Sequence, residues 1–473
     1  MLFTSSVFIL FFLPILFLCY FIIPGKCIRI RNLVLLIFSL VFYGWGSVKY
    51  LSLLIISIIL NYTGGVLVGT LTNVKYKKTA LAVTVTANLG LLGVFKYAGF
   101  IAETINSIGI NIPIPQIVLP IGISFFTFQG LSYVVDVYRK DAAVQKNPLY
   151  VGLYISLFPQ LVAGPIVRYT DVEAEIVSRK HTLSDFSDGA VRFMIGFGKK
   201  MLMANAMGGI ADKIFAYSGT DLLNTEAAWI GAVAYTFQIY FDFSAYSDMA
   251  IGLGLMFGFH FKENFNYPYI STSVTEFWRR WHISLSTWFR DYVYIPLGGS
   301  YCSVGRNIFN LSVVWMLTGM WHGAAWTFIL WGVYYGVLLI LEKYVFNKIL
   351  EKIPSIFMYL PTIFIVIIGW VIFRSPGISE AGRFLAAMFG FGGMTAGPGL
   401  YYLHEFAFEW IICLIGIFPI KLILEKGLSI GEKNHLIFLV TKLAPKIFAL
   451  SVFILSYMKL VSGSFNPFIY FQF

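Results

Sequence analysis

Charged side chains are scarce in this sequence. Asp, Glu, Lys and Arg make up 12% of the 473 residues, whereas hydrophobic residues reach 58% and the mean hydropathy is +0.78. A soluble globular domain carries about twice as many charges. A soluble protein could not cover its surface with so few, but lipid tails accept apolar side chains without penalty. The shortage excludes an ordinary soluble enzyme and predicts a membrane protein, and the spanning runs described below predict that it is polytopic and all-α.

Other absences exclude further classes of protein. The four cysteines are scattered without any CxxC spacing, so neither a disulfide framework nor a thiolate metal site is indicated. The sequence has no P-loop, no GxSxG elbow and no metal-ligand cluster, so no metal site is predicted. The net charge of +11 fits basic residues kept on the cytoplasmic side near anionic lipid, and we expect no nucleic-acid partner.

Apolar runs that could span a bilayer recur through the whole chain. They lie at 7–23, 33–48, 51–70, 79–96, 117–137, 228–257, 308–342, 357–373, 408–424 and 445–461. Several are short or broken, so we expect roughly eleven spans with re-entrant or interfacial helices. We predict one integral-membrane domain over 1–473. Its parts are N-terminal spans over 1–150, a motif-bearing core over 151–345 and C-terminal spans over 346–473.

Basic residues are distributed unevenly among the connecting loops. They follow the first, third and fifth runs at 26–31, 75–78 and 139–146, whereas the loop predicted at 97–116 contains only Glu103. Because cytoplasmic loops retain Lys and Arg, this alternation predicts an extracytoplasmic N-terminus. The polar stretch 168–200 is expected to be a cytoplasmic loop that includes an amphipathic helix.

His322 is the sharpest candidate for chemistry. No Asp, Glu, Lys or Arg occurs between Arg306 and Glu342, and titratable groups at membrane depth are costly and suggest function. Gly319 and Gly323 flank the histidine, permit a close approach by backbone or substrate, and favour a break in the helix. A neutral imidazole there could take a proton from an attacking hydroxyl. The alternative is a buried histidine bonded to a neighbouring helix.

The segment 276–292 carries an aromatic stripe at helical spacing. Its members are Trp278, Trp281, Leu285, Trp288 and Tyr292. We predict an interfacial or re-entrant helix that is aromatic on one side and basic on the other. His282 lies beside the stripe and is expected to face the protein. Arg279, Arg280 and Arg290 could hold phosphates of an acyl donor. The alternative is an anchor at the membrane surface.

Two carboxylates, Asp242 and Asp248, interrupt the run at 228–257. Buried carboxylates need partners, and the arginines of 276–292 are the candidates. A structural role in organising the core is favoured. A proton relay, or a group that orients a histidine, is the sharper alternative.

Five motifs in this order resemble those of the membrane-bound O-acyltransferase (MBOAT) family. They are FPQLVAGPIVRY, YFDFSAYSDMAIG, FWRRWHISLSTWFRDYVYIPLGG, LTGMWHGAAWTFILWG and the terminal PFIYFQF. Within that family, the sequences of these motifs are most similar to those of the subgroup named for alginate O-acetylation. The N-terminal third matches more loosely.

The resemblance implies a helical bundle with a central tunnel in a bacterial plasma membrane. Acetyl-CoA would be the donor substrate, entering from the cytoplasm, with no permanently bound cofactor. His322 matches the family's central catalytic histidine and would act as general base, whereas His282 would orient substrate or line the tunnel beside Trp321. An extracytoplasmic esterase-like partner of the SGNH/GDSL type would complete transfer to a polysaccharide. Transfer of D-alanine or another acyl group by the same fold, and a non-catalytic export channel, are the alternatives.

Overall fold

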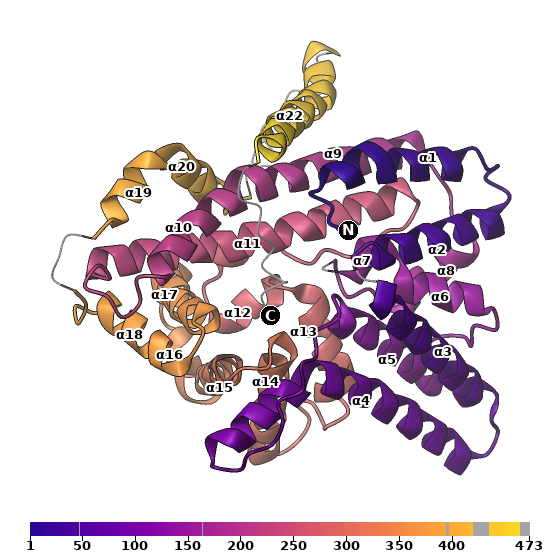
Figure 1. The fold of residues 1–473 in the computed structure, drawn as a ribbon, viewed down its shortest axis with the longest axis horizontal. Helices are drawn as coiled ribbons and strands as arrows, with labels where there is room; N and C mark the ends of the chain where they lie inside the picture. The colour runs from indigo at the N-terminus through magenta and orange to yellow at the C-terminus, as the bar shows by residue number, and fades with distance from the viewer. Residues whose placement is uncertain (47, 163, 394–396, 420–434, 464–473) are drawn as a thin grey trace. The chain divides into compact units, whose positions relative to one another are not determined.

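The chain folds into helices that form two compact units. The computed structural model describes residues 1–463 apart from 47, 163, 394–396 and 420–434 (Figure 1). Helices account for 75% of the chain and the described residues contain no strand, which confirms the all-α prediction. The first unit comprises Met1–Phe193 and Tyr246–Lys262, and the second comprises Met194–Ala245 and Glu263–Phe473.

The first unit contains the N-terminal helices. They are η1 (Phe8–Phe12), α1 (Leu13–Phe21), α2 (Ile28–Gly44), α3 (Val48–Thr70), α4 (Val74–Ser107), α5 (Ile123–Arg139), α6 (Pro148–Ser156), α7 (Phe158–Leu161) and α8 (Tyr169–Val177). Two longer helices, α9 (Leu183–Gly198) and α11 (Thr225–Met256), contribute to both units.

The second unit contains the remaining elements. They are η2 (Lys199–Ala204), α10 (Asn205–Phe215), η3 (Pro268–Ile270), α12 (Val274–Arg280), α13 (Ile283–Phe289), η4 (Arg290–Tyr294), α14 (Val304–His322), α15 (Trp326–Leu341), η5 (Glu342–Phe346), α16 (Asn347–Leu350), α17 (Ser355–Arg374), α18 (Ile378–Met388), α19 (Gly399–Glu405), α20 (Ala407–Gly416) and α22 (His435–Val461).

Five helical segments of the described chain are long and apolar enough to cross a membrane by length and composition. They are Val48–Thr70, Val74–Ser107, Trp326–Phe346, Ser355–Arg374 and Leu443–Val461. The larger number of spans stays a prediction. The loop predicted at 97–116 is wrong in its first half, because α4 continues as helix to Ser107. Of the run at 408–424, α20 ends at Gly416, and residues 420–424 lie outside the described chain.

Amides join two apolar helices in the first unit. Asn61 of α3 and Asn88 of α4 exchange hydrogen bonds of 3.0 and 3.1 Å between their side chains, and both residues are buried. Each amide also donates to the backbone carbonyl four residues earlier. Because an unpaired amide is costly in an apolar interior, this pair fixes the register of α3 against α4.

A second polar cluster of this unit surrounds His181, between α8 and α9. Arg31 donates to Nδ1 of His181 at 3.0 Å, so Nδ1 holds the lone pair. Nε2–H then donates to the hydroxyl of Tyr20 at 2.8 Å. Arg179 donates to the same hydroxyl at 2.8 Å and to Asn32 at 2.7 Å. The contacts join α1, α2 and the end of α8, and they require a neutral imidazole.

In the second unit, α14 and α15 form a tightly packed hairpin. A Cβ atom on Gly319 would lie 2.3 Å from the backbone oxygen of Phe328, and one on Gly332 would lie 2.4 Å from that of Trp315. Two helices that face each other through such glycines approach backbone to backbone. The break between them spans residues 323–325. The helix break predicted beside His322 is therefore confirmed.

We expect the first unit to lose stability in acid. Burial, together with the positive charges of Arg31 and Arg179, lowers the pKa of His181 from 6.5 to about 4. Between pH 6.5 and 4 the His181 side chain is protonated in the unfolded chain but stays neutral in the folded chain. Its contribution to the free energy of unfolding is therefore fully present above pH 6.5 and is lost as the pH decreases toward 4. The thermal midpoint of the purified protein in detergent, measured across this range, should fall less steeply for His181→Asn. The exposed-histidine control His404→Ala should keep the wild-type slope, and equal slopes for all three proteins would contradict the assignment.

The glycine contacts of the hairpin predict a strong effect of a single methyl group. Gly332→Ala should destabilise the protein by about 1–3 kcal/mol, because the new Cβ meets the backbone of α14. Gly305→Ala in α14 is the matched control, since nothing lies within 4 Å of its Cβ position. It should be neutral or stabilising by up to about 1 kcal/mol. Thermal midpoints of the two variants in detergent test the difference, and equal midpoints would refute the close packing.

Candidate functional site

His322 is the last residue of α14, where the hairpin breaks. It is 8% exposed, and the extended backbone of Gly323 ends the helix directly after it. Aromatic rings surround the imidazole: the ring centroids of Trp321, Trp331 and Phe373 lie 5.0, 5.1 and 5.1 Å away. The histidine is thus held at a helix terminus and is surrounded by aromatic side chains.

The single helix predicted over 276–292 is wrong. The segment forms α12, α13 and η4, and the break between α12 and α13 falls at Trp281 and His282. His282 has φ 43° and ψ 54°, a left-handed conformation that is uncommon for residues other than glycine. Four of the five stripe residues, Trp278, Trp281, Leu285 and Trp288, are nevertheless buried. These four side chains face the interior, but a chain broken at residues 281–282 carries them instead of one face of a single helix.

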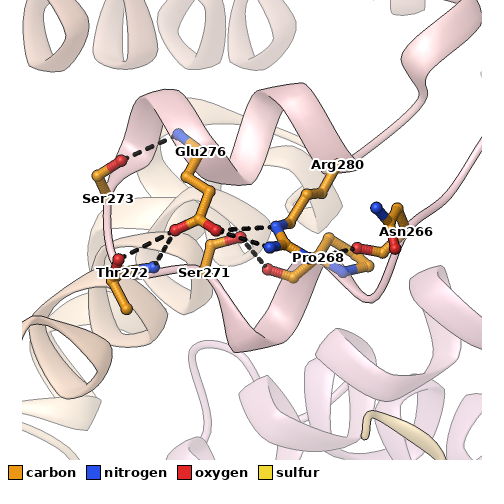
Figure 2. Close-up of polar contacts among 7 residues, drawn as sticks. All are labelled: Asn266, Pro268, Ser271, Thr272, Ser273, Glu276 and Arg280. Carbon is orange, nitrogen blue, oxygen red and sulfur yellow. Dashed lines mark hydrogen bonds and ion pairs between the residues drawn. The ribbon is translucent and has the colours of Figure 1, made fainter. Parts of the chain in front are cut away.

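The first turn of α12 is held by hydroxyl and carboxylate acceptors, of which Figure 2 shows Ser273 and Glu276. The Ser273 hydroxyl accepts the backbone N–H of Glu276 at 3.0 Å, and the Glu276 carboxylate accepts from Thr272. Glu342, from η5, accepts the backbone N–H groups of Val274 and Thr275 at 2.8 and 3.0 Å. These bonds satisfy the free donors of the helix start, and they fix the direction in which Trp278 and Trp281 point.

His282 itself is held by a side chain from the loop after α11. Its Nδ1 atom lies 3.1 Å from Oδ1 of Asn264, and the ring is 1% exposed. The Trp321 ring centroid is 5.8 Å from that of His282 and 5.0 Å from that of His322. The two histidines predicted from the sequence therefore lie in the same unit and contact the same indole ring.

An aromatic cluster forms the wall behind the histidines. Trp278 contacts Trp315, Tyr335 and Trp331 with ring centroids 4.8, 4.8 and 5.4 Å apart. Trp281 lies 4.8 Å from Trp370. In the described part of the chain, Nε1 of Trp278, Nε1 of Trp331 and Nε2 of His282 are buried without a hydrogen-bond partner. Such atoms are rare in folded proteins and are commonly met by water or a ligand.

The two acidic residues pair with cations that the sequence analysis did not name. Asp242 forms an ion pair of 2.9 Å with Lys200 of η2, and both side chains are at most 1% exposed. Asp248 pairs with Arg192 of α9 at 2.9 Å. The prediction that the arginines of 276–292 would be their partners is therefore wrong. The two carboxylates also belong to different units.

The three arginines predicted to hold phosphates differ in their surroundings. Arg280 binds Glu276 and the backbone oxygen of Asn266, so its guanidinium is used within the fold (Figure 2). Arg290 pairs with the neighbouring Asp291 and is 58% exposed. Arg279 is exposed. Arg279 and Arg290 remain candidates to meet an anionic substrate, whereas Arg280 is a structural residue of the α12 turn.

The sequence analysis missed the residues that form hydrogen bonds or ion pairs with the predicted site residues and their helices. Asn264, Glu342 and Lys200 each hold a predicted site residue or its helix, although they lie 18, 68 and 42 positions away from the groups they bind. Asn264 stands in an ordinary polar loop sequence. Lys200 could have been found, because Lys199 and Lys200 stand at the start of an apolar stretch, and a cation buried there needs a counter-charge.

Comparison of the sequence with known proteins shows which family the chain belongs to. The pattern that defines the membrane-bound O-acyltransferase family matches residues 123–375, which include both histidines. The chain is also 40% identical to a probable alginate O-acetylase of Azotobacter vinelandii over the full length of both proteins. The chain belongs to the membrane-bound O-acyltransferase family. It is therefore an acyltransferase and a membrane protein, as its composition and motifs predicted.

The names of other relatives of this MBOAT protein refer to different polymers. It is 35% identical to a peptidoglycan O-acetyltransferase of Helicobacter pylori, across 87% of this chain and 83% of the relative. It is 31% identical to a teichoic acid D-alanyltransferase of Bacillus subtilis, across 50% of this chain and 62% of the relative.

Of the five sequence motifs that resemble the family, the terminal PFIYFQF lies outside the residues that the structure describes.

The buried ion pair predicts a large and asymmetric effect of mutation. Asp242→Asn should destabilise the protein by about 3–5 kcal/mol, because it leaves the ammonium group of Lys200 buried without its counter-charge. Replacing both partners, as Lys200→Met with Asp242→Leu, should recover most of the loss. The exposed pair Arg383–Glu380 is the control, and Arg383→Gln should cost at most about 1 kcal/mol. Thermal midpoints in detergent measure all three, and an equal loss for Asp242→Asn and Arg383→Gln would contradict the pairing.

Proposed function

We propose that this protein transfers acetyl groups from acetyl-CoA for the O-acetylation of an exported polysaccharide. Full-length similarity to a probable alginate O-acetylase carries the proposal, and similarity to a peptidoglycan O-acetyltransferase supports the acetyl group. The polymers in these two names differ, so they support a hydroxyl-bearing glycan as the acceptor class, with alginate and cellulose as examples.

In the proposed reaction His322 acts as general base. A hydroxyl group attacks the thioester carbonyl, and the imidazole takes the hydroxyl proton as the new C–O bond forms. The tetrahedral intermediate then expels the thiolate, which receives the same proton from the imidazolium and leaves as a thiol. The products are the acetyl ester and free CoA. The C-terminal end of α14 favours the transient positive charge on the ring.

The aromatic wall supports this assignment. Trp321 contacts both imidazoles, so an acyl group bound beside its indole ring could meet His322 and His282. The unpaired N–H groups of Trp278 and Trp331 are donors available to a carbonyl oxygen or to water. Arg279 and Arg290, both exposed, would bind phosphates of the donor.

The number of membrane spans, the tunnel and the orientation of the protein in the membrane are part of the same proposal. We infer roughly eleven spans with a central tunnel, an extracytoplasmic N-terminus and placement in a bacterial plasma membrane. Donor would enter from the cytoplasm and acceptor from the opposite side. An SGNH/GDSL-type partner outside the membrane would pass the acetyl group to the polymer.

Transfer of D-alanine is the second candidate. The similarity to teichoic acid D-alanyltransferase favours it, although that match covers only half of this chain. The two reactions share the attack on a thioester carbonyl and differ in the donor, which gives them different ester products. Chemical analysis of the polymer distinguishes them.

His322→Ala should reduce acetyl transfer by about 10²–10⁴-fold, the contribution typical of a general base. The measurement is the ester-linked acetyl content of secreted polysaccharide in cells that lack the protein and express either wild type or the variant. The amount of protein in the membrane is matched between strains. His404→Ala, which changes an exposed histidine of α19, is the control and should restore wild-type acetylation.

Each outcome decides one part of the proposal. Full acetylation with His322→Ala would show that the histidine is structural, and it would favour the export channel over an enzyme centred on His322. Failure of wild type to restore acetyl esters would refute the acetyl donor, and the polymer would then be analysed for D-alanyl esters.

A further inference from the structure

Asn264 lies on the loop between α11 and η3 and is fully buried. Its Oδ1 atom faces three polar atoms. The backbone N–H of Ser284 lies 3.1 Å away, the Ser284 hydroxyl 2.8 Å and Nδ1 of His282 3.1 Å. A backbone N–H can only donate, so the oxygen of the amide, and not its nitrogen, must face this group.

This orientation determines the protonation of His282. An amide oxygen and an unprotonated ring nitrogen 3.1 Å apart would repel each other, because both would present lone pairs. Nδ1 therefore carries the hydrogen and donates it to Asn264. In the neutral ring Nε2 must then hold the lone pair, and this atom is buried without a partner in the part of the chain that the structure describes.

The backbone reinforces the same geometry. Ile283 donates its N–H to the backbone oxygen of Asn264 at 2.9 Å, so the loop and the start of α13 are joined at two points. His282 holds its left-handed conformation between these bonds. A residue in a costly conformation persists where its surroundings determine it, and such residues concentrate at functional sites.

We propose that Asn264 is a positioning residue that locks His282 in the Nδ1–H tautomer and thereby presents Nε2 as a proton acceptor to the substrate. The inference rests on the proposed acyl transfer for its kinetic consequence, but the tautomer itself does not depend on which acyl group is moved. In this proposal the donor that Nε2 meets is a hydroxyl or thiol of the substrate, since Nε2 has no hydrogen-bond partner in the described chain and the rings of Phe243, Phe265 and Trp321 surround the imidazole.

The direct test is nitrogen-15 spectroscopy of the full-length protein labelled at histidine, in detergent or lipid. Ring nitrogens that carry a proton are distinguished by chemical shift from those with a lone pair, and correlations to the carbon-bound ring protons tell Nδ1 from Nε2. The His282 signals are assigned as those missing from His282→Gln. We expect a protonated Nδ1 and an unprotonated Nε2. The opposite tautomer in wild type would overturn the proposal without any variant of Asn264.

Two substitutions separate positioning from simple support of the fold. Asn264→Leu removes the acceptor and should lower kcat by roughly 10–100-fold, the range seen when partners that orient a histidine are lost, with KM for the donor unchanged. Asn264→Asp keeps the acceptor. It should keep the Nδ1–H tautomer, and its negative charge should move the acidic limb of the pH profile of kcat to higher pH by favouring the imidazolium.

Asn266→Ala is the matched control, because Asn266 belongs to the same loop and its side chain is exposed. It should leave kcat, the pH profile and the His282 spectrum unchanged. A His282 ring that keeps one tautomer in Asn264→Leu, or a pH profile unmoved in Asn264→Asp, would overturn the positioning role. Should wild type transfer no acetyl, the proposed function would fail while the spectrum still decided the tautomer.

Discussion

Polar groups buried in an apolar protein must find partners within the protein, and this constraint determines how the second unit is built. Helix α12 begins where the backbone is partly buried, and its free N–H groups are satisfied by Ser273 and by Glu342 from a helix distant in the sequence. The break after α12 is held by Asn264. Without these bonds the exposed backbone at each helix end would cost several kilocalories per mole. The positions of both histidines follow from them.

The same constraint explains why the structure tolerates charge in its interior. Lys200 and Asp242 are almost inaccessible, and each is acceptable because the other lies 2.9 Å away. In the first unit, Arg31 and Arg179 are bonded to neutral acceptors, which include a neutral His181. Buried charge is met in one place by an opposite charge and in the other by neutral hydrogen-bond acceptors.

Close backbone packing supplies the remaining geometry. The glycines at 319 and 332 bring α14 against α15, so that His322 ends one helix where the second turns back. The aromatic side chains of α12, α15 and α17 then fill the space beside it. Histidines held in this way have little freedom to rotate. A fixed imidazole suits the general base proposed for His322, which must meet a hydroxyl in one orientation.

The sequence by itself determined the membrane class and the all-α fold, and it singled out two histidines that the fold brings to one indole ring, because composition, apolar run length and local motifs are properties of neighbouring residues. It also predicted the break beside His322 from the glycines. It could not predict the break at His282, since periodicity continued through it and a loop side chain from position 264 decided the backbone. Nor could it pair Asp242 with Lys200 or Glu342 with α12. Those partners are distant in sequence, and only the folded chain brings a donor within bonding distance of its acceptor.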